Sequence, residues 1–159
     1  MNDSIAKIDE VDTRLIIALQ KDASLSQRAL ADEVGLSQNA CYRRLQKLTQ
    51  SGILLGASMR VNPAAIGLSL TVFMMLRTRN HDIKWARRLR QRAESIPEIV
   101  ELHRVGGEWD YLLKVVTSGI GGYDRVYQNL ITDLEFEAVT GIFSMETMLD
   151  NRPLPVLKR

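Results

Sequence analysis

The sequence of 159 residues predicts an α+β fold, with helices in the first third followed by a ferredoxin-like βαββαβ domain. The spacing of the apolar residues carries this prediction. Up to about residue 50, apolar residues recur three or four positions apart, which is typical of amphipathic helices. From Leu68 onward the spacing alternates between a period of two and a helical period, which indicates strands interleaved with helices.

The composition is that of an ordinary globular protein, with 45% apolar and 25% charged residues. Such a chain buries a core, so wholesale disorder, collagen and coiled coils are excluded. Apolar runs such as 72–76 are far shorter than the ~20 residues of a membrane span, and the N-terminus is acidic rather than signal-like. We therefore expect a cytoplasmic protein. A lone cysteine, Cys41, and two histidines predict neither an internal disulfide nor a metal site.

Three short helices are predicted in the first third of the chain. The first follows Asp9, whose side chain can cap its opening turn. The second covers Gln27 to Val34 and ends at Gly35, because glycine accepts the left-handed backbone of a sharp helix exit. Ser37 is then the expected N-cap of a third helix from Gln38 to about Gln50. The second and third helices thus form a helix, a tight glycine turn and a helix.

The second half is predicted to follow the order βαββαβ, after a boundary marked by Asn62-Pro63. The expected domains are 1–60, a linker or hinge strand at 61–66, and 67–159. Strands are expected at 68–77, 99–105, 111–116 and 139–149, and helices at 83–96 and 123–134. With both helices on one side of the sheet, the other side would expose large apolar residues, so we expect a homodimer through that face.

The third predicted helix carries candidate DNA-reading residues on the side opposite its apolar stripe. Arginine reads guanine, asparagine and glutamine pair with adenine, and lysine contacts phosphates, while a capped helix N-terminus also attracts phosphate. A basic face can also be simply solvated, but the preceding helix and glycine turn favour recognition of double-stranded DNA. The candidate DNA contacts are Gln27, Ser37, Gln38, Asn39, Tyr42, Arg43, Gln46 and Lys47.

Three stretches together resemble the Lrp/AsnC (feast/famine) transcriptional regulators. The first is the helix-turn-helix region, in which Arg44 and Gly52 stand where the family pattern has them. The second is 107–113, similar to the family's loop of glycine, acid, aromatic residue and aspartate, and the third is the final strand with Leu154-Pro155. A departure is Leu134-Glu135, where the family usually has Pro-Gly.

The resemblance implies a winged helix-turn-helix joined to a ferredoxin-like domain for effector binding and oligomerisation, with dimers that often assemble into octamers. Amino acids are the usual effectors, bound where two dimers meet. Carried over by position, the candidate effector contacts are Arg104, Gly107, Glu108, Trp109, Asp110, Ile120, Ile142, Phe143 and Ser144. A carboxylate such as Asp110 suits an ammonium group, and glycine-loop amides suit a carboxylate. Asp110 could equally cap a turn, and Trp109 and Phe143 could be interface core.

The sequence therefore predicts a DNA-binding transcriptional regulator tuned by a small-molecule effector, with no catalytic residues and no cofactor. Two alternatives stay open at this point. One is an enzyme similar to the siroheme decarboxylases, which resemble the same two-domain pattern, although the histidine count is low. The other is an effector-binding assembly module without DNA binding, which the presence of Asn39, Arg43 and Lys47 disfavours.

Overall fold

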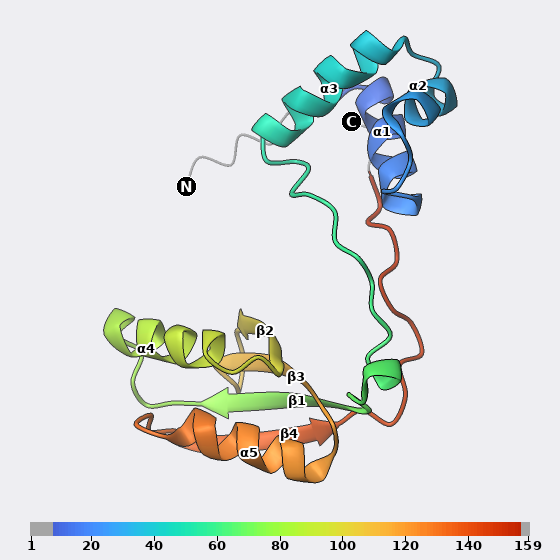
Figure 1. The fold of residues 1–159 in the computed structure, drawn as a ribbon. Coiled ribbons are helices and arrows are strands. Elements are labelled where there is room, and N and C mark those ends of the chain that lie inside the picture. The colour runs from blue at the N-terminus through green and yellow to red at the C-terminus, as the bar shows by residue number, and fades with distance from the viewer. Residues whose placement is uncertain (1–7, 157–159) are drawn as a thin grey trace. The chain divides into compact units, whose positions relative to one another are not determined.

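The computed structural model describes residues 8–156, which divide into two compact units. One unit holds the described residues up to Arg60 together with those from Leu149 onward, and the other is Val61–Met148 (Figure 1). Residues 1–7 and 157–159, at the outer ends of the predicted domains, lie outside the described range. None of the helices within 8–156 is long and apolar enough to span a bilayer.

The first unit contains α1 (Glu10–Lys21), α2 (Gln27–Val34) and α3 (Gln38–Gln50), which confirms the three predicted helices. Asp9 and Asp12 form a reciprocal capping box at the start of α1, each carboxylate accepting the other residue's backbone N–H. Gly35 adopts φ 71° at the end of α2, as the predicted sharp exit requires.

The core of the first unit forms where the three helices meet. It is built from Leu15, Leu30 and Leu48 among others, and Cys41 is completely buried within it. Burial raises the pKa of the Cys41 thiol, so this cysteine is a small packed hydrophobe and not an exposed thiolate.

The segment after α3 differs from the expected wing and hinge strand. Within the described residues, no strand is found between α3 and Leu70. Ala64–Ile66 instead forms a short 3-10 helix, η1, so the predicted hinge strand at 61–66 is wrong. The cause is local, because Asn62 accepts a hydrogen bond from the Ala64 N–H and Pro63 holds a helical φ of −64°.

The chain returns to the first unit at its C-terminal end, which corrects the predicted second domain of 67–159. The Gln20 side chain on α1 both donates to the Leu154 carbonyl (3.2 Å) and accepts from the Leu154 N–H (2.6 Å). Arg60 forms an ion pair with Asp150, and Val156 packs against the helical core. The tail is therefore part of the helical unit.

The second unit is a four-stranded antiparallel sheet with two helices, in the predicted βαββαβ order. Its elements are β1 (Leu70–Arg77), α4 (Ile83–Glu94), β2 (Ile99–Arg104), β3 (Tyr111–Thr117), α5 (Ile120–Ile131) and β4 (Ala138–Phe143). The strand order β2-β3-β1-β4 is that of the ferredoxin-like fold, so the predicted fold class is confirmed. The last strand ends at Phe143 and is shorter than the predicted 139–149. In the observed register the first residue of β1, Leu70, stands opposite position 145, so residues 146–149 have no partner on β1.

The two sides of the sheet differ in burial. Val72, Met74 and Leu76 of β1 are completely buried beneath both helices, together with Leu89 of α4 and Leu130 of α5. The opposite side carries large apolar residues that are only partly covered within the chain, as predicted. They are Phe73, Met75, Leu112, Val116 and Ile142.

Candidate DNA-reading helix and effector site

The candidate base-reading residues of α3 share one exposed face. Asn39, Arg43, Gln46 and Lys47 are all exposed, and Tyr42 extends the same face with half of its surface accessible. The opposite side of α3 holds the buried Cys41 and Leu48. Two amide groups, one guanidinium group and one ammonium group thus project away from the core, as insertion into a major groove requires.

Arg44 points to the other side of α3 and holds the helix against α1. Its guanidinium lies 2.6 Å from the Asp9 carboxylate and 2.7 Å from the Asp12 carboxylate. The pKa of Asp9 is lowered by its hydrogen bond from the Asp12 backbone and by Arg44, and the pKa of Arg44 is raised by Asp9 and Asp12. Arg44 is therefore a positioning residue that sets the angle at which α3 presents its outer face.

Gln27 and Ser37, the predicted phosphate contacts near the turn between α2 and α3, also form hydrogen bonds within the protein. The Gln27 side chain donates to the Gln38 carbonyl at 3.1 Å, and the Ser37 hydroxyl accepts from the Ala40 N–H at 3.3 Å. Both side chains remain exposed. They brace the start of α3, and their contact with DNA stays a prediction.

The nine predicted effector contacts lie in two groups at opposite ends of the sheet. One group follows β2 and precedes β3: Arg104, Gly107, Glu108, Trp109 and Asp110. The other lies at the start of α5 and the end of β4: Ile120, Ile142, Phe143 and Ser144. Leu76 near the end of β1 pairs with Tyr111, whereas Val72 near its start pairs with Phe143. The seven residues of β3 separate the groups by about 20 Å, so one chain does not bring them together.

Asp110 is held at the end of the sheet by hydrogen bonds of its side chain and of its backbone. One carboxylate oxygen accepts the Thr78 N–H at 2.8 Å, and the other lies 3.7 Å from Nδ1 of His81. The Asp110 backbone also bonds to Leu76 and Val105. The carboxylate thus caps the N–H of a segment 32 residues away rather than its own turn, and within the described residues no hydrogen bond reaches the oxygen that faces His81.

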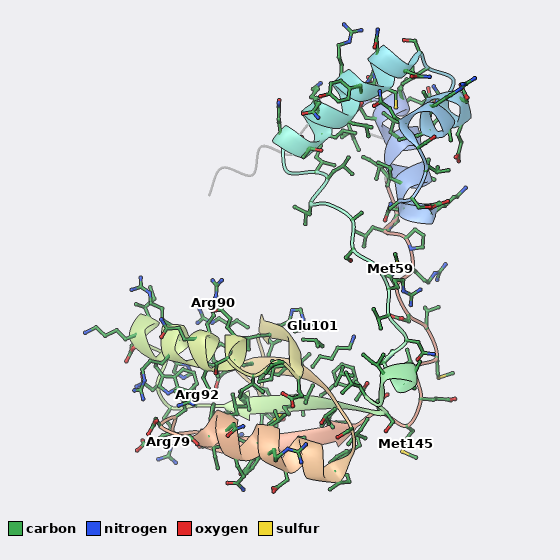
Figure 2. The ribbon with its side chains drawn as sticks, viewed as in Figure 1. Met59, Arg79, Arg90, Arg92, Glu101 and Met145 are labelled. Carbon is green, nitrogen blue, oxygen red and sulfur yellow. The ribbon has the colours of Figure 1, made fainter. Side chains whose placement is uncertain are left out.

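Three charged residues beside this loop were missed by sequence reasoning. Arg77 lies over the Trp109 ring, 5.6 Å from its centroid, and 3.8 Å from the Glu108 carboxylate. Glu137 pairs with both Arg77 (3.3 Å) and Arg79 (3.5 Å), and Figure 2 labels Arg79 beyond the end of β1. The alternation of β1 places Arg77 on the open sheet face, but its contact with Trp109 depends on a loop over 30 residues away.

At the other end of the sheet, Phe143 packs edge-on against Tyr123 of α5, with ring centroids 5.3 Å apart. Burial raises the pKa of the Tyr123 hydroxyl. The Ser144 N–H donates to the Thr71 carbonyl, which closes the ladder between β4 and β1. Ile120 at the start of α5 is exposed, and so is Ile142, which lies on the open face of the sheet next to Phe73. This end therefore offers an apolar wall, whereas the loop end offers charges and backbone amides.

The fold and the exposed face of α3 define a helix-turn-helix protein with a separate ferredoxin-like unit. Residues 8–49 match the family model of the AsnC-type helix-turn-helix domain, and residues 71–154 match that of the Lrp/AsnC ligand binding domain. The chain therefore belongs to the Lrp/AsnC family of transcriptional regulators, which confirms the resemblance noted in the sequence.

Similar proteins cover almost the whole chain. The glutamate uptake regulatory protein of Zymomonas mobilis is 36% identical over 152 residues, which span 96% of this chain and 93% of that protein. The DNA-binding transcriptional activator DecR of Escherichia coli is 35% identical over 150 residues, which span 94% of this chain and 99% of DecR. These relatives are named as regulators and not as enzymes.

Among solved structures, an AsnC family transcriptional regulator from Agrobacterium tumefaciens superposes with a TM-score of 0.87 at 35% identity. The match covers 93% of this chain and 97% of that one. The Neisseria meningitidis regulator NMB0573, solved as a complex with L-Met, has a TM-score of 0.86 at 22% identity over 94% and 97% of the two chains. The latter likeness shows the shared fold.

Proposed function

We propose that this protein is a sequence-specific transcriptional regulator whose α3 reads the major groove and whose ferredoxin-like unit binds an amino acid. The exposed face of α3 carries the proposal: it holds the base-reading residues on one side of a helix that is anchored by Arg44. Such a protein acts in the cytoplasm, where it reaches DNA, and its relatives' names support regulation rather than catalysis.

Within the DNA interface, residues differ in what they contribute. Asn39, Arg43 and Gln46 present amide and guanidinium groups that match adenine and guanine edges. Lys47 contacts a phosphate of the DNA. Gln27 of α2 and Ser37 and Gln38 at the start of α3 approach the sugar-phosphate backbone of the DNA, with Tyr42 beside them. Specificity then lies in the first group and affinity in the second.

For the effector, the two ends of the sheet act as complementary half-sites. Asp110 binds the ammonium group, the Gly107 loop binds the carboxylate, and the apolar wall at Phe143 of another copy accepts the side chain. The sheet's open face forms the homodimer, because it exposes large apolar residues that a monomer rarely leaves uncovered. Dimers then associate through these half-sites and assemble into an octamer, so effector binding is coupled to assembly.

The proposal is tested in two steps. A random-sequence duplex library is first selected with the purified protein, and the enriched operator is used to compare wild type with Arg43→Ala and Lys47→Ala. We expect Arg43→Ala to lose base preference and Lys47→Ala to weaken binding to all sequences alike. Enrichment of no sequence would contradict the DNA-reading role and favour the assembly module.

The particle mass is then measured by light scattering across a panel of the proteinogenic amino acids. We expect a multimeric mass that shifts with one or a few of them, and loss of this shift in Asp110→Ala. An unchanged response in Asp110→Ala would move the effector site away from the loop. A mass that no amino acid alters would contradict the coupling of effector binding to assembly.

A further inference from the structure

The outer face of α4, in the ferredoxin-like unit, carries a concentration of positive charge that neither the α3 interface nor the effector site uses. Its twelve residues include five basic residues and one acid, whereas the thirteen residues of α3 include three basic residues. This charge belongs to the ferredoxin-like unit and not to the unit that holds the helix-turn-helix.

The charges are arranged as a stripe along the helix. Trp85, Leu89 and Ala93 are buried against the sheet, and the residues on the outward side are all exposed. At spacings of three, four and seven residues, these lie along one line about 10 Å long. The residues of this basic stripe are Lys84, Arg87, Arg88 and Gln91.

Few carboxylates neutralise this helix. Arg90 pairs with Glu94 at 2.7 Å and Arg92 with Asp133 at 3.3 Å, and Figure 2 shows Arg90 and Arg92 projecting from α4. Across residues 8–156, no carboxylate comes within ion-pair distance of the bases of the basic stripe, and Arg88 donates to a backbone carbonyl. Like charges one turn apart repel and weaken a helix, so an anionic partner would stabilise this arrangement.

We propose that the basic stripe of α4 binds the sugar-phosphate backbone of duplex DNA, as a sequence-independent contact in addition to α3. Over about 10 Å a duplex presents about six phosphate charges, which three cations and an amide donor match in sign and in hydrogen bonding.

Other anionic partners fit this surface less well. The stripe has no aromatic residue on which an unstacked base could lie, which disfavours single strands. It has no large apolar anchor of the kind that dominates protein interfaces. Trp85, Leu89 and Ala93 of α4 are buried in the core, and Ile83 is the one large apolar residue that this helix exposes, which is too little to insert into a lipid surface.

The experiment measures binding of the full-length protein to a duplex of arbitrary sequence about 150 bp long, one persistence length, as a function of salt. The test variant is Lys84→Gln/Arg87→Gln, and Arg125→Gln, an exposed arginine on α5, is the control. Each phosphate contact contributes about 0.9 to the slope of log K against log salt. We therefore expect the test variant's slope to fall by about 1.8 and its affinity in 0.1 M salt to fall at least about tenfold.

The variant Arg43→Gln/Lys47→Gln separates this proposal from the function of α3. We expect it to lose the selected operator while its binding to arbitrary DNA still depends on Lys84 and Arg87. An unchanged slope and affinity in Lys84→Gln/Arg87→Gln would overturn the proposal. A changed particle mass with unchanged DNA binding would also overturn it, by assigning the stripe to contacts between protein chains.

Discussion

Replacing Arg44 by alanine is expected to destabilise the helical unit without removing a DNA contact. Arg44 is the cationic partner of Asp12, whose side chain is only 3% exposed, so Arg44→Ala strands a buried carboxylate. Breaking a fully buried pair costs about 3 to 5 kcal/mol. Here Arg44 is 32% exposed and Asp12 keeps the Asp9 N–H, so we expect a loss of about 1 to 3 kcal/mol.

The assay can separate the two units, because both tryptophans, Trp85 and Trp109, lie in the ferredoxin-like unit. Urea unfolding is followed by tryptophan fluorescence for that unit and by far-ultraviolet circular dichroism for all helices. We expect Arg44→Ala to shift the dichroism transition to lower urea and to leave the fluorescence transition in place.

The neighbouring Arg43 is the matched control, because it is exposed and has no ion pair in the described part of the chain. Arg43→Ala should change stability by less than about 0.5 kcal/mol. Equal unfolding midpoints for Arg43→Ala and Arg44→Ala would refute the anchoring role of Arg44.

The effect should also depend on pH. The folded-state pKa of Asp9 is lowered, so its stabilising contribution is present above its ordinary value of 3.8 and is lost as the pH falls toward the folded value. Arg44→Ala removes part of that lowering, and the stability difference from wild type should therefore shrink as the pH drops below about 4.

Three further predictions concern other parts of the chain. Arg43→Ala should cost about 1 to 3 kcal/mol of operator binding by fluorescence anisotropy, with little change on arbitrary DNA; equal losses on both would assign Arg43 to phosphate. Gly122→Ala should lower stability by about 1 to 3 kcal/mol in fluorescence-detected unfolding, because its Cβ would stand 2.1 Å from the buried Thr117 hydroxyl. Gly121→Ala, with open space, should instead gain up to about 1 kcal/mol, and similar values would disprove the clash. Gln20→Ala removes both hydrogen bonds to Leu154 and should speed proteolysis of the tail; an unchanged cleavage rate would show that the tail does not depend on them.

Features that depend on local chain geometry were predictable from the sequence. The bounds of α2 and α3 follow from Ser26, Gly35 and Ser37, which act on backbone groups within four residues. The exposed face of α3 follows equally from helical periodicity, because the angle between side chains on one helix is fixed. The hinge strand expected at 61–66 is absent because Pro63, which marks the domain boundary in the sequence, precedes a turn of 3-10 helix.

Features that depend on contacts between distant segments were not predictable. Arg44 and Asp12 are 32 residues apart, and so are Thr78 and Asp110. Helical periodicity places Arg43 on the outer face of α3, but it does not show that Arg44 meets the carboxylates of Asp9 and Asp12. The division of the effector residues likewise follows from strand register, since the resemblance collects positions without showing that one chain places them at two ends of a sheet.

The separation of the half-sites leads to a test that distinguishes a site within one chain from a site between chains. An amino acid is far shorter than the seven residues of β3, so Asp110 and Phe143 of one chain cannot hold the same molecule. Asp110→Ala and Phe143→Ala should each abolish the effector response when expressed alone. In a co-expressed equal mixture, about one quarter of sites would combine an intact loop from one chain with an intact aromatic wall from another, and that fraction of ligand binding should return. Calorimetry of the mixed assembly measures the fraction directly. A mixture as inactive as its components would show that no site combines the loop of one chain with the aromatic wall of another, and would refute the site between chains.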